Sequence, residues 1–275
     1  MFELGRISGY EGTPWLAVSR LSDYCGAPLL VTEWATMQTV LVINSKGGSG
    51  KTTIASNLAS LFAASHLKTA LMDYDPQGSS LHWNSIRQQG DFPGIHLVDA
   101  SHLKVGLTRT FQLRIPDGIE RVVIDAPAGM CSKMLAEVVS KADVIVVPVL
   151  PSPIDIHASS EFIYELKLIL NTSRRHDTVL GVVANRVRSD NGHGLYQPLK
   201  GFLNELDIPF ITTLTDTDNY ISAVELGVGI HELKPQAVKL ELSQWLPLVK
   251  WLAVSNRVTA ESQAIGGATR AVEAM

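Results

Sequence analysis

The clearest pattern along the chain is a series of short apolar runs separated by longer segments of mixed polarity. The run TVLVIN, from Thr39 to Asn44, is almost continuously apolar and ends in a turn rich in glycine. Such a run is typical of a parallel strand that is buried on both faces. Similar runs predict further strands at Ala70 to Asp73, Arg121 to Asp125, Val144 to Val149, Val179 to Ala184 and Phe210 to Thr212.

Segments with helical spacing lie between these runs. The segment Lys51 to Ser65 is rich in Ala and Leu, and Pro153 to Leu170 and Leu195 to Leu206 also have helical spacing. Pro235 to Val254 carries an apolar stripe, and Pro247 is expected to kink or split this last helix. Strands that alternate with helices predict an α/β fold, with a mainly parallel central sheet flanked by helices.

The alternation of strands and helices does not extend to the segments at either end of the chain. Residues Met1 to Thr36 have mixed polarity and no clear period, so we expect an amino-terminal extension of unknown order. Residues 37–254 are expected to form one domain, which suits a chain of 275 residues. The polar segment Ser255 to Met275 is expected to be a flexible tail.

Composition narrows the function classes. The chain is 45% hydrophobic and 18% charged, which excludes wholesale disorder. Cys25 and Cys131 lie far apart without CxxC spacing, so neither a disulfide framework nor a zinc site is predicted. No apolar run approaches the roughly 20 residues that span a bilayer. We therefore expect a cytoplasmic protein with no transmembrane segment, and its formal net charge of -4 gives no overall attraction to nucleic acid.

The strongest chemical signal is the run SKGGSGKTT, from Ser45 to Thr53, directly after the first predicted strand. Glycines let backbone N–H groups converge on a phosphate, and a helix that begins there favours the anion. The Lys51 ammonium would contact the outer phosphates, and the Thr52 hydroxyl would bind a bridging magnesium ion. The pattern predicts a P-loop for ATP and Mg²⁺, formed by Gly47, Gly48, Ser49, Gly50, Lys51, Thr52 and Thr53.

Carboxylates follow two further predicted strands. The run LMDYDPQGSS carries Asp73 and Asp75, and the run VVIDAPAG carries Asp125. Because the carboxyl ends of parallel strands share one edge of a sheet, we expect these groups to meet the P-loop there. Asp73 also suits a structural, hydrogen-bonded role at the strand end.

These motifs together resemble a known family. The common P-loop has Gly where this chain has Ser45, whereas KGGSGKTT, with its additional Lys46, resembles the deviant P-loop of the ParA/MinD superfamily of ATPases. DYDPQG and the Asp125 run resemble the elements that follow the second and third strands in that family. The resemblance spans about Met37 to Leu252 and implies ATP hydrolysis.

The resemblance also implies roles for single residues. Lys46 corresponds to a lysine that reaches the nucleotide across an ATP-dependent homodimer interface, and Asp75 to the group that orients the attacking water. Asp125 would hold magnesium together with Thr52. Asn185, in the run GVVANRV, is the candidate base contact, although an Asn at a strand end also suits a turn.

Within the superfamily, the chain resembles ParA-like members, including small ParA proteins and the McdA proteins that position carboxysomes. Such proteins dimerise on ATP, bind nucleoid DNA non-specifically and move a plasmid, chromosome or carboxysome. A small adaptor or a ParB-like or McdB-like protein stimulates hydrolysis. A MinD-like membrane-associated regulator is the alternative, but the terminus AIGGATRAVEAM lacks aromatics and Leu. A nitrogenase-type reductase would need a second cluster cysteine beside Cys131.

DNA binding would depend on cationic side chains that neutralise phosphates without reading bases. Acidic residues outnumber basic ones from Asn185 onward, so solvated surface charge is the alternative reading. The candidates are Arg174, Arg175, Arg186 and Arg188, with Lys234, Lys239 and Lys250 as further ones.

Overall fold

The apolar runs of the sequence form a central parallel sheet. The structure is a computed structural model and describes residues 37–101, 113–172, 177–188 and 196–273, with side chains as far as residue 256. The strand order in this part of the chain is β3-β2-β4-β1-β5-β6-β7, and every pairing is parallel. The strands are β1 (Gln38–Val42), β2 (Thr69–Asp73), β3 (His96–Asp99), β4 (Arg121–Asp125), β5 (Val144–Val149), β6 (Val179–Val187) and β7 (Phe210–Thr215).

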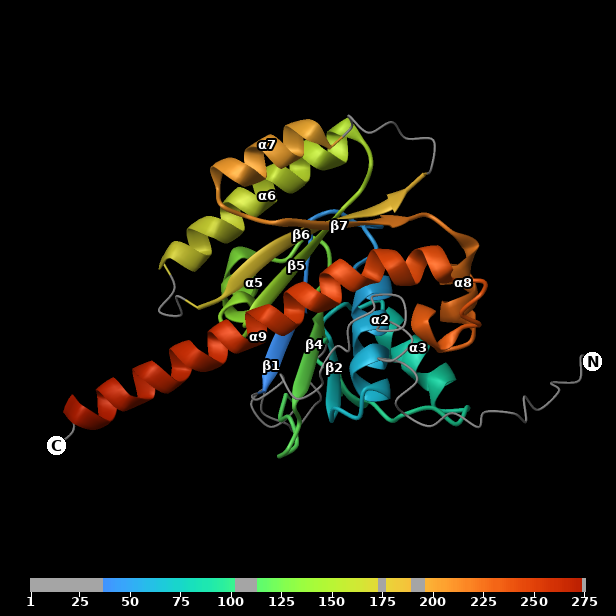
Figure 1. Cartoon of the computed structure of the whole chain (residues 1–275), viewed down its shortest axis with the longest axis horizontal. Coiled ribbons are helices and arrows are strands. Elements are labelled where there is room, and N and C mark those ends of the chain that lie inside the picture. Colours follow the sequence, from blue (N-terminus) through green and yellow to red (C-terminus); the bar gives the residue numbers. More distant parts are fainter. Residues whose placement is uncertain (1–36, 102–112, 173–176, 189–195, 274–275) are drawn as a thin grey trace, which may run out of the picture.

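Helices cover both faces of the sheet, as Figure 1 shows. The helices are α2 (Lys51–Ala64), α3 (Ser79–Arg87), α5 (Ser132–Val139), α6 (Pro153–Thr172), α7 (Gln197–Glu205), α8 (Asp218–Glu225), the short η2 (Ile230–Glu232) and α9 (Lys239–Glu273). On β1, Leu41 belongs to the apolar core that α5, α6 and α7 cover. Its neighbours Val40 and Val42 belong to the core that α2, α3 and α9 cover. The expected α/β fold, a mainly parallel central sheet flanked by helices, is therefore confirmed.

The strand order places β1 at the centre of the sheet, between β4 and β5. From β1 the chain passes through α2 to β2 on one side, whereas β5, β6 and β7 continue on the other side. Ligands of open α/β sheets bind at the carboxyl ends of the strands, where the connections diverge in this way. The segment between β1 and α2 is the predicted P-loop, so the fold puts it at this position.

The last helix differs from the sequence-based expectation. Pro247 lies inside α9 and does not split it. The helix also continues past Val254, the predicted end of the domain, and its backbone is helical as far as Glu273. The buried side chains Leu242, Trp245 and Leu252 pack this helix against the sheet on both sides of Pro247, which favours one continuous element.

Some predictions lie outside the described residues, namely the amino-terminal extension 1–36 and the candidates Arg174 and Arg175. Within the described ranges, the structure contains no helix that is both long and apolar enough to cross a membrane.

Candidate nucleotide-binding site

The P-loop begins α2 through a glycine in the left-handed region. Gly50 precedes the first helical residue, Lys51, and has φ 89° and ψ 23°. A Cβ atom at Gly50 would lie 2.0 Å from Nδ2 of Asn185, far inside van der Waals contact. Glycine is therefore required here both by the backbone conformation and by the close approach of β6.

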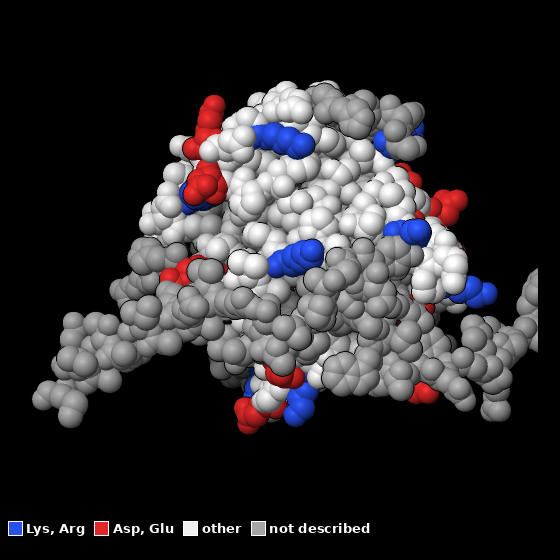
Figure 2. Space-filling model, in the orientation of Figure 1, with Lys and Arg blue, Asp and Glu red and all other residues white. Residues whose placement is uncertain are grey.

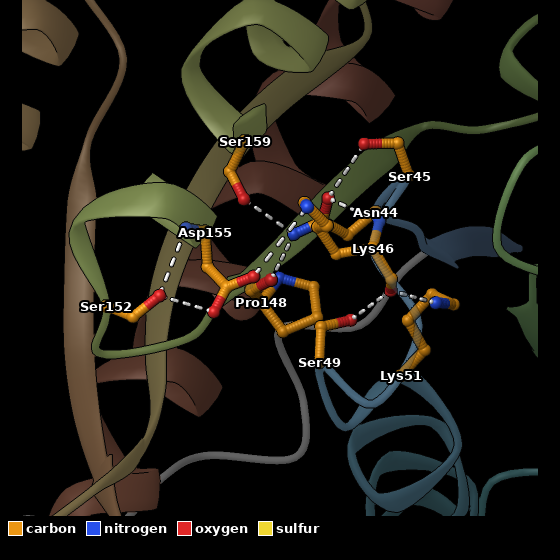
Figure 3. Close-up of polar contacts among 9 residues, drawn as sticks. All are labelled: Asn44, Ser45, Lys46, Ser49, Lys51, Pro148, Ser152, Asp155 and Ser159. Carbon is orange, nitrogen blue, oxygen red and sulfur yellow. Dashed lines mark hydrogen bonds and ion pairs between the residues drawn. The ribbon is translucent and has the colours of Figure 1, made fainter. Parts of the chain in front are cut away.

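Lys51 folds back over the loop. Its Nζ donates a hydrogen bond of 2.9 Å to the carbonyl oxygen of Lys46, which also accepts one of 3.2 Å from Oγ of Ser49 (Figure 3). Burial lowers the pKa of Lys51, while the charges of Asp125 and Asp75 raise it. The ammonium and the two carboxylates therefore interact electrostatically at the same edge of the sheet, which suits a site for phosphates and a metal ion.

Asn44, which the sequence analysis did not single out, anchors the start of the loop. It is 1% exposed, and its Nδ2 donates to the carbonyl oxygen of Pro148 at 2.6 Å and to Oγ of Ser159 at 3.0 Å. Its Oδ1 accepts the backbone N–H of Lys46 at 3.2 Å (Figure 3). One amide therefore ties β1, β5, α6 and the P-loop together. A polar residue that ends an apolar strand was the available signal.

Asn185 anchors the other end of the loop. Its side chain is 5% exposed, and its Nδ2 donates to the carbonyl oxygen of Ser49 at 2.8 Å. The residue thus stabilises the P-loop from β6. Contact with a nucleotide base remains a prediction from the resemblance.

Asp73 organises the loop that follows β2. Its Oδ1 accepts the backbone N–H of Asp75 at 2.9 Å, and its Oδ2 accepts that of Leu81 at 3.1 Å. Burial raises the pKa of Asp73, and these two backbone hydrogen bonds lower it in part. Of the two readings of this residue, the geometry favours the structural one.

Asp75 is placed differently from Asp73. It is half-buried, and its Oδ1 accepts the backbone N–H of Gln77 at 2.9 Å. Its charge raises the pKa of Lys51, and it follows β2 at the carboxyl edge of the sheet, where the P-loop also lies. This position suits a group that orients a water molecule next to a bound phosphate.

Asp125 has the features of a metal ligand. It is 1% exposed, its Oδ2 accepts a hydrogen bond of 2.7 Å from Oγ of Ser80, and its Oδ1 is buried without a hydrogen-bond partner. Burial raises the pKa of Asp125 to about 7, and the hydroxyls of Ser80 and Thr52 lower it in part. Because a buried carboxylate oxygen needs a partner, the unpaired Oδ1 and the nearby Thr52 hydroxyl fit a magnesium ion.

Lys46 extends from the loop toward α6. Its side chain is 36% exposed, and Nζ lies 4.0 Å from Oδ1 of Asp155 (Figure 3). Ser152 holds Asp155 in place, since its Oγ donates to Oδ2 at 2.6 Å and accepts the Asp155 N–H at 3.1 Å. An exposed ion pair of this length contributes little free energy, so the lysine remains available for another anion.

The candidate DNA contacts Arg186 and Arg188 are both exposed. Arg186 has φ 56°, and its Nε lies 3.2 Å from Oδ1 of Asp216. On the face that Figure 2 shows, the coloured Lys and Arg side chains are separated by uncharged surface, with acidic side chains toward the edges. One copy of the described chain therefore presents scattered positive charge on this face.

Comparisons with known proteins agree with this geometry. The sequence matches the family described as "CobQ/CobB/MinD/ParA nucleotide binding domain" over residues 40–230. It is 28% identical over 196 residues to "Maintenance of carboxysome distribution protein A" from Halothiobacillus neapolitanus, which covers 71% of this chain and 87% of that protein. It is 27% identical over 202 residues to "Protein ParA" from Rhizobium radiobacter, covering 72% and 87% respectively.

Solved structures show the same fold. An ATP complex of a McdA variant from Cyanothece superposes with a TM-score of 0.59 at 18% sequence identity, covering 77% of this chain and 96% of that one. The family match spans more than half of the 275 residues and includes the P-loop and both carboxylate motifs. The resemblance to the ParA/MinD superfamily is confirmed, and the chain belongs to the CobQ/CobB/MinD/ParA family of nucleotide-binding domains.

Proposed function

We propose that this protein is a ParA-type ATPase that dimerises on ATP, binds DNA non-specifically and positions a cargo through partner-stimulated ATP hydrolysis. The observation that carries the proposal is that the P-loop after β1, Asp75 after β2 and Asp125 at the end of β4 share the carboxyl edge of the sheet, where Asp125 is the register partner of both Val42 and Asp73. The relatives named for carboxysome distribution and ParA support a positioning role. A plasmid, a chromosome and a carboxysome are the candidate cargoes.

The site residues divide the chemistry among them. The loop N–H groups and Lys51 would hold the phosphates, while Thr52 and Asp125 would hold Mg²⁺, which neutralises phosphate charge when bound. Asp75 lies in the loop after β2, at the same edge of the sheet, and would orient the attacking water. The exposed ammonium of Lys46 would contact the nucleotide of a second copy, where it stabilises negative charge that develops during transfer.

The first prediction is that ATP with Mg²⁺, but not ADP, converts monomer into dimer, and that Lys46→Ala weakens this dimerisation by roughly 30-fold or more. The reason is that the variant removes a charge pair across the interface. Light scattering over a range of protein concentrations measures the effect. Lys68→Ala is the matched control, because Lys68 is an exposed lysine that precedes β2, at the opposite edge of the sheet.

The assigned role of Lys46 would be wrong if its alanine variant dimerised on ATP as well as the parent protein does. ATP binding to the monomer serves as the internal check, since the contacts of Lys46 with Lys51 and Ser49 use its backbone carbonyl. Monomer affinity for ATP should therefore change little.

The second prediction concerns DNA. The ATP dimer should bind unrelated duplexes with equal affinity, and binding should fall steeply between roughly 50 and 200 mM salt. Dimerisation brings two sets of scattered cationic side chains onto one assembly, so weak phosphate contacts add through effective concentration. Replacing Arg186 and Arg188 with Ala should reduce the salt slope by roughly one for each phosphate contact removed.

Gel shifts with ATP, ADP and no nucleotide, at both salt concentrations, test this expectation. Lys68→Ala again serves as control, and light scattering should show that the arginine variant still dimerises. An ATP dimer that ignored DNA and instead co-sedimented with anionic liposomes would replace the DNA-binding proposal with the MinD-like alternative.

A further inference from the structure

Ser80 connects α3 to the candidate metal ligand. The residue lies in the first turn of α3, directly after the loop that carries Asp75, and its side chain is fully buried. Its Oγ donates a hydrogen bond of 2.7 Å to Oδ2 of Asp125, a residue 45 positions further along the chain. The proposed catalytic roles do not use this contact.

The two carboxylate oxygens of Asp125 differ in their hydrogen bonding. Oδ2 is held by Ser80, whereas Oδ1 is buried and has no hydrogen-bond partner. The hydrogen bond from Ser80 restrains rotation of the Asp125 carboxylate, so that one oxygen stays paired with Ser80 and the other stays unpaired. Hydrogen bonds from neighbouring residues commonly orient ligating carboxylates and tune their metal affinity in this way.

The backbone beside Ser80 is connected to Asp75 through Asp73. Asp73 accepts the backbone N–H of Asp75 through one oxygen and that of Leu81, the neighbour of Ser80, through the other. Asp73 and Asp125 are also register partners at the ends of adjacent strands. The positions of the Asp75 loop, the start of α3 and Asp125 are therefore linked.

We propose, on the basis of the magnesium site proposed above, that Ser80 is a positioning residue that holds Asp125 with Oδ1 free for Mg²⁺ and couples this ligand to the loop carrying Asp75. Ser80 touches neither nucleotide nor metal in this role. It acts through Asp125, and its loss should appear first as weaker use of Mg²⁺.

Ser79 provides a matched control for this proposal. It is the preceding residue of the same helical turn, carries the same side chain and is exposed. Alanine suits a helix at either position. The two single variants, Ser80→Ala and Ser79→Ala, therefore differ mainly in the hydrogen bond to Asp125.

The experiment titrates MgCl₂ against each full-length variant and follows binding of a fluorescent ATP analogue, with a parallel measurement in EDTA. For Ser80→Ala we expect the Mg²⁺ midpoint to rise about tenfold or more, and for Ser79→Ala to stay within about twofold of the parent. Affinity for the analogue in EDTA should be unchanged in both. If Ser80→Ala proves unstable in a thermal melt, Ser80→Cys keeps a similar volume with a weaker donor and should shift the midpoint in the same direction.

An unchanged Mg²⁺ midpoint in Ser80→Ala would overturn the positioning role. So would an equal loss of analogue binding in EDTA, which would mark Ser80 as a general structural residue. A parent protein whose binding did not respond to Mg²⁺ at all would overturn the proposed magnesium site as well, so the two failures are distinguishable.

Discussion

Lys51→Ala is expected to weaken ATP binding by about 100-fold, because it removes a charged hydrogen-bond donor from the phosphate site. Lys51 is buried, its ammonium donates a hydrogen bond to the Lys46 carbonyl, and the charges of Asp125 and Asp75 raise its pKa. No other lysine side chain in the described loop occupies this place, since Lys46 points toward Asp155. Isothermal titration calorimetry with ATP and Mg²⁺ measures the loss.

Asp75→Ala is the control for this experiment. It removes a charge from the same site without removing a phosphate contact, so the variant should bind ATP with an affinity close to that of the parent. Its phosphate release should nevertheless be much slower, since water orientation is lost. Equal loss of binding in both variants would contradict the division of roles between Lys51 and Asp75.

Gly50→Ala is expected to lower the free energy of unfolding by about 3 kcal/mol, which corresponds to a fall in Tm of roughly 6–12 °C. The new Cβ atom would meet Nδ2 of Asn185 at 2.0 Å, and φ of 89° disfavours any residue with a side chain. Asn185 would have to move, which breaks its hydrogen bond to Ser49. Thermal unfolding without nucleotide measures the effect.

Gly47→Ala is the matched control in the same loop. A Cβ atom at Gly47 would meet no atom within 4 Å, and Gly47 is not among the residues with positive φ. Its Tm should stay within about 2 °C of the parent. A Gly50→Ala variant as stable as Gly47→Ala would show that the loop can adapt, contrary to the geometry described above.

The central strands could be predicted from sequence because they are buried on both faces. The runs Arg121 to Asp125 and Val144 to Val149 match β4 and β5 at both ends, since every residue in them is buried. The edge strand β3 (His96–Asp99) was not predicted. Only Val98 in it is fully buried, so its sequence has neither a continuous apolar run nor a clear alternation.

The P-loop could be predicted because its residues are adjacent along the chain. The groups that hold this loop and the metal ligand are distant from them along the chain, so the sequence does not show which residues they contact. Asn185 bonds a carbonyl 136 positions away, and Ser80 bonds Asp125 across 45 positions. Asn44 contacts Pro148 and Ser159 at similarly long range. These hydrogen bonds depend on which strands and helices lie next to one another in the folded protein.

The backbone carbonyl and the side chain of Lys46 act at two different sites in the proposed dimer. Its carbonyl oxygen holds Lys51 and Ser49 in its own subunit, whereas its side chain extends outward beside Asp155. In the proposed dimer, substitution of Lys46 therefore affects the nucleotide site of the other subunit, whereas substitution of Lys51 affects the nucleotide site of the same subunit. A mixed dimer of Lys46→Ala and Lys51→Ala subunits would still contain one complete site. That site lies in the Lys46→Ala subunit, which keeps its own Lys51 and receives Lys46 from its partner.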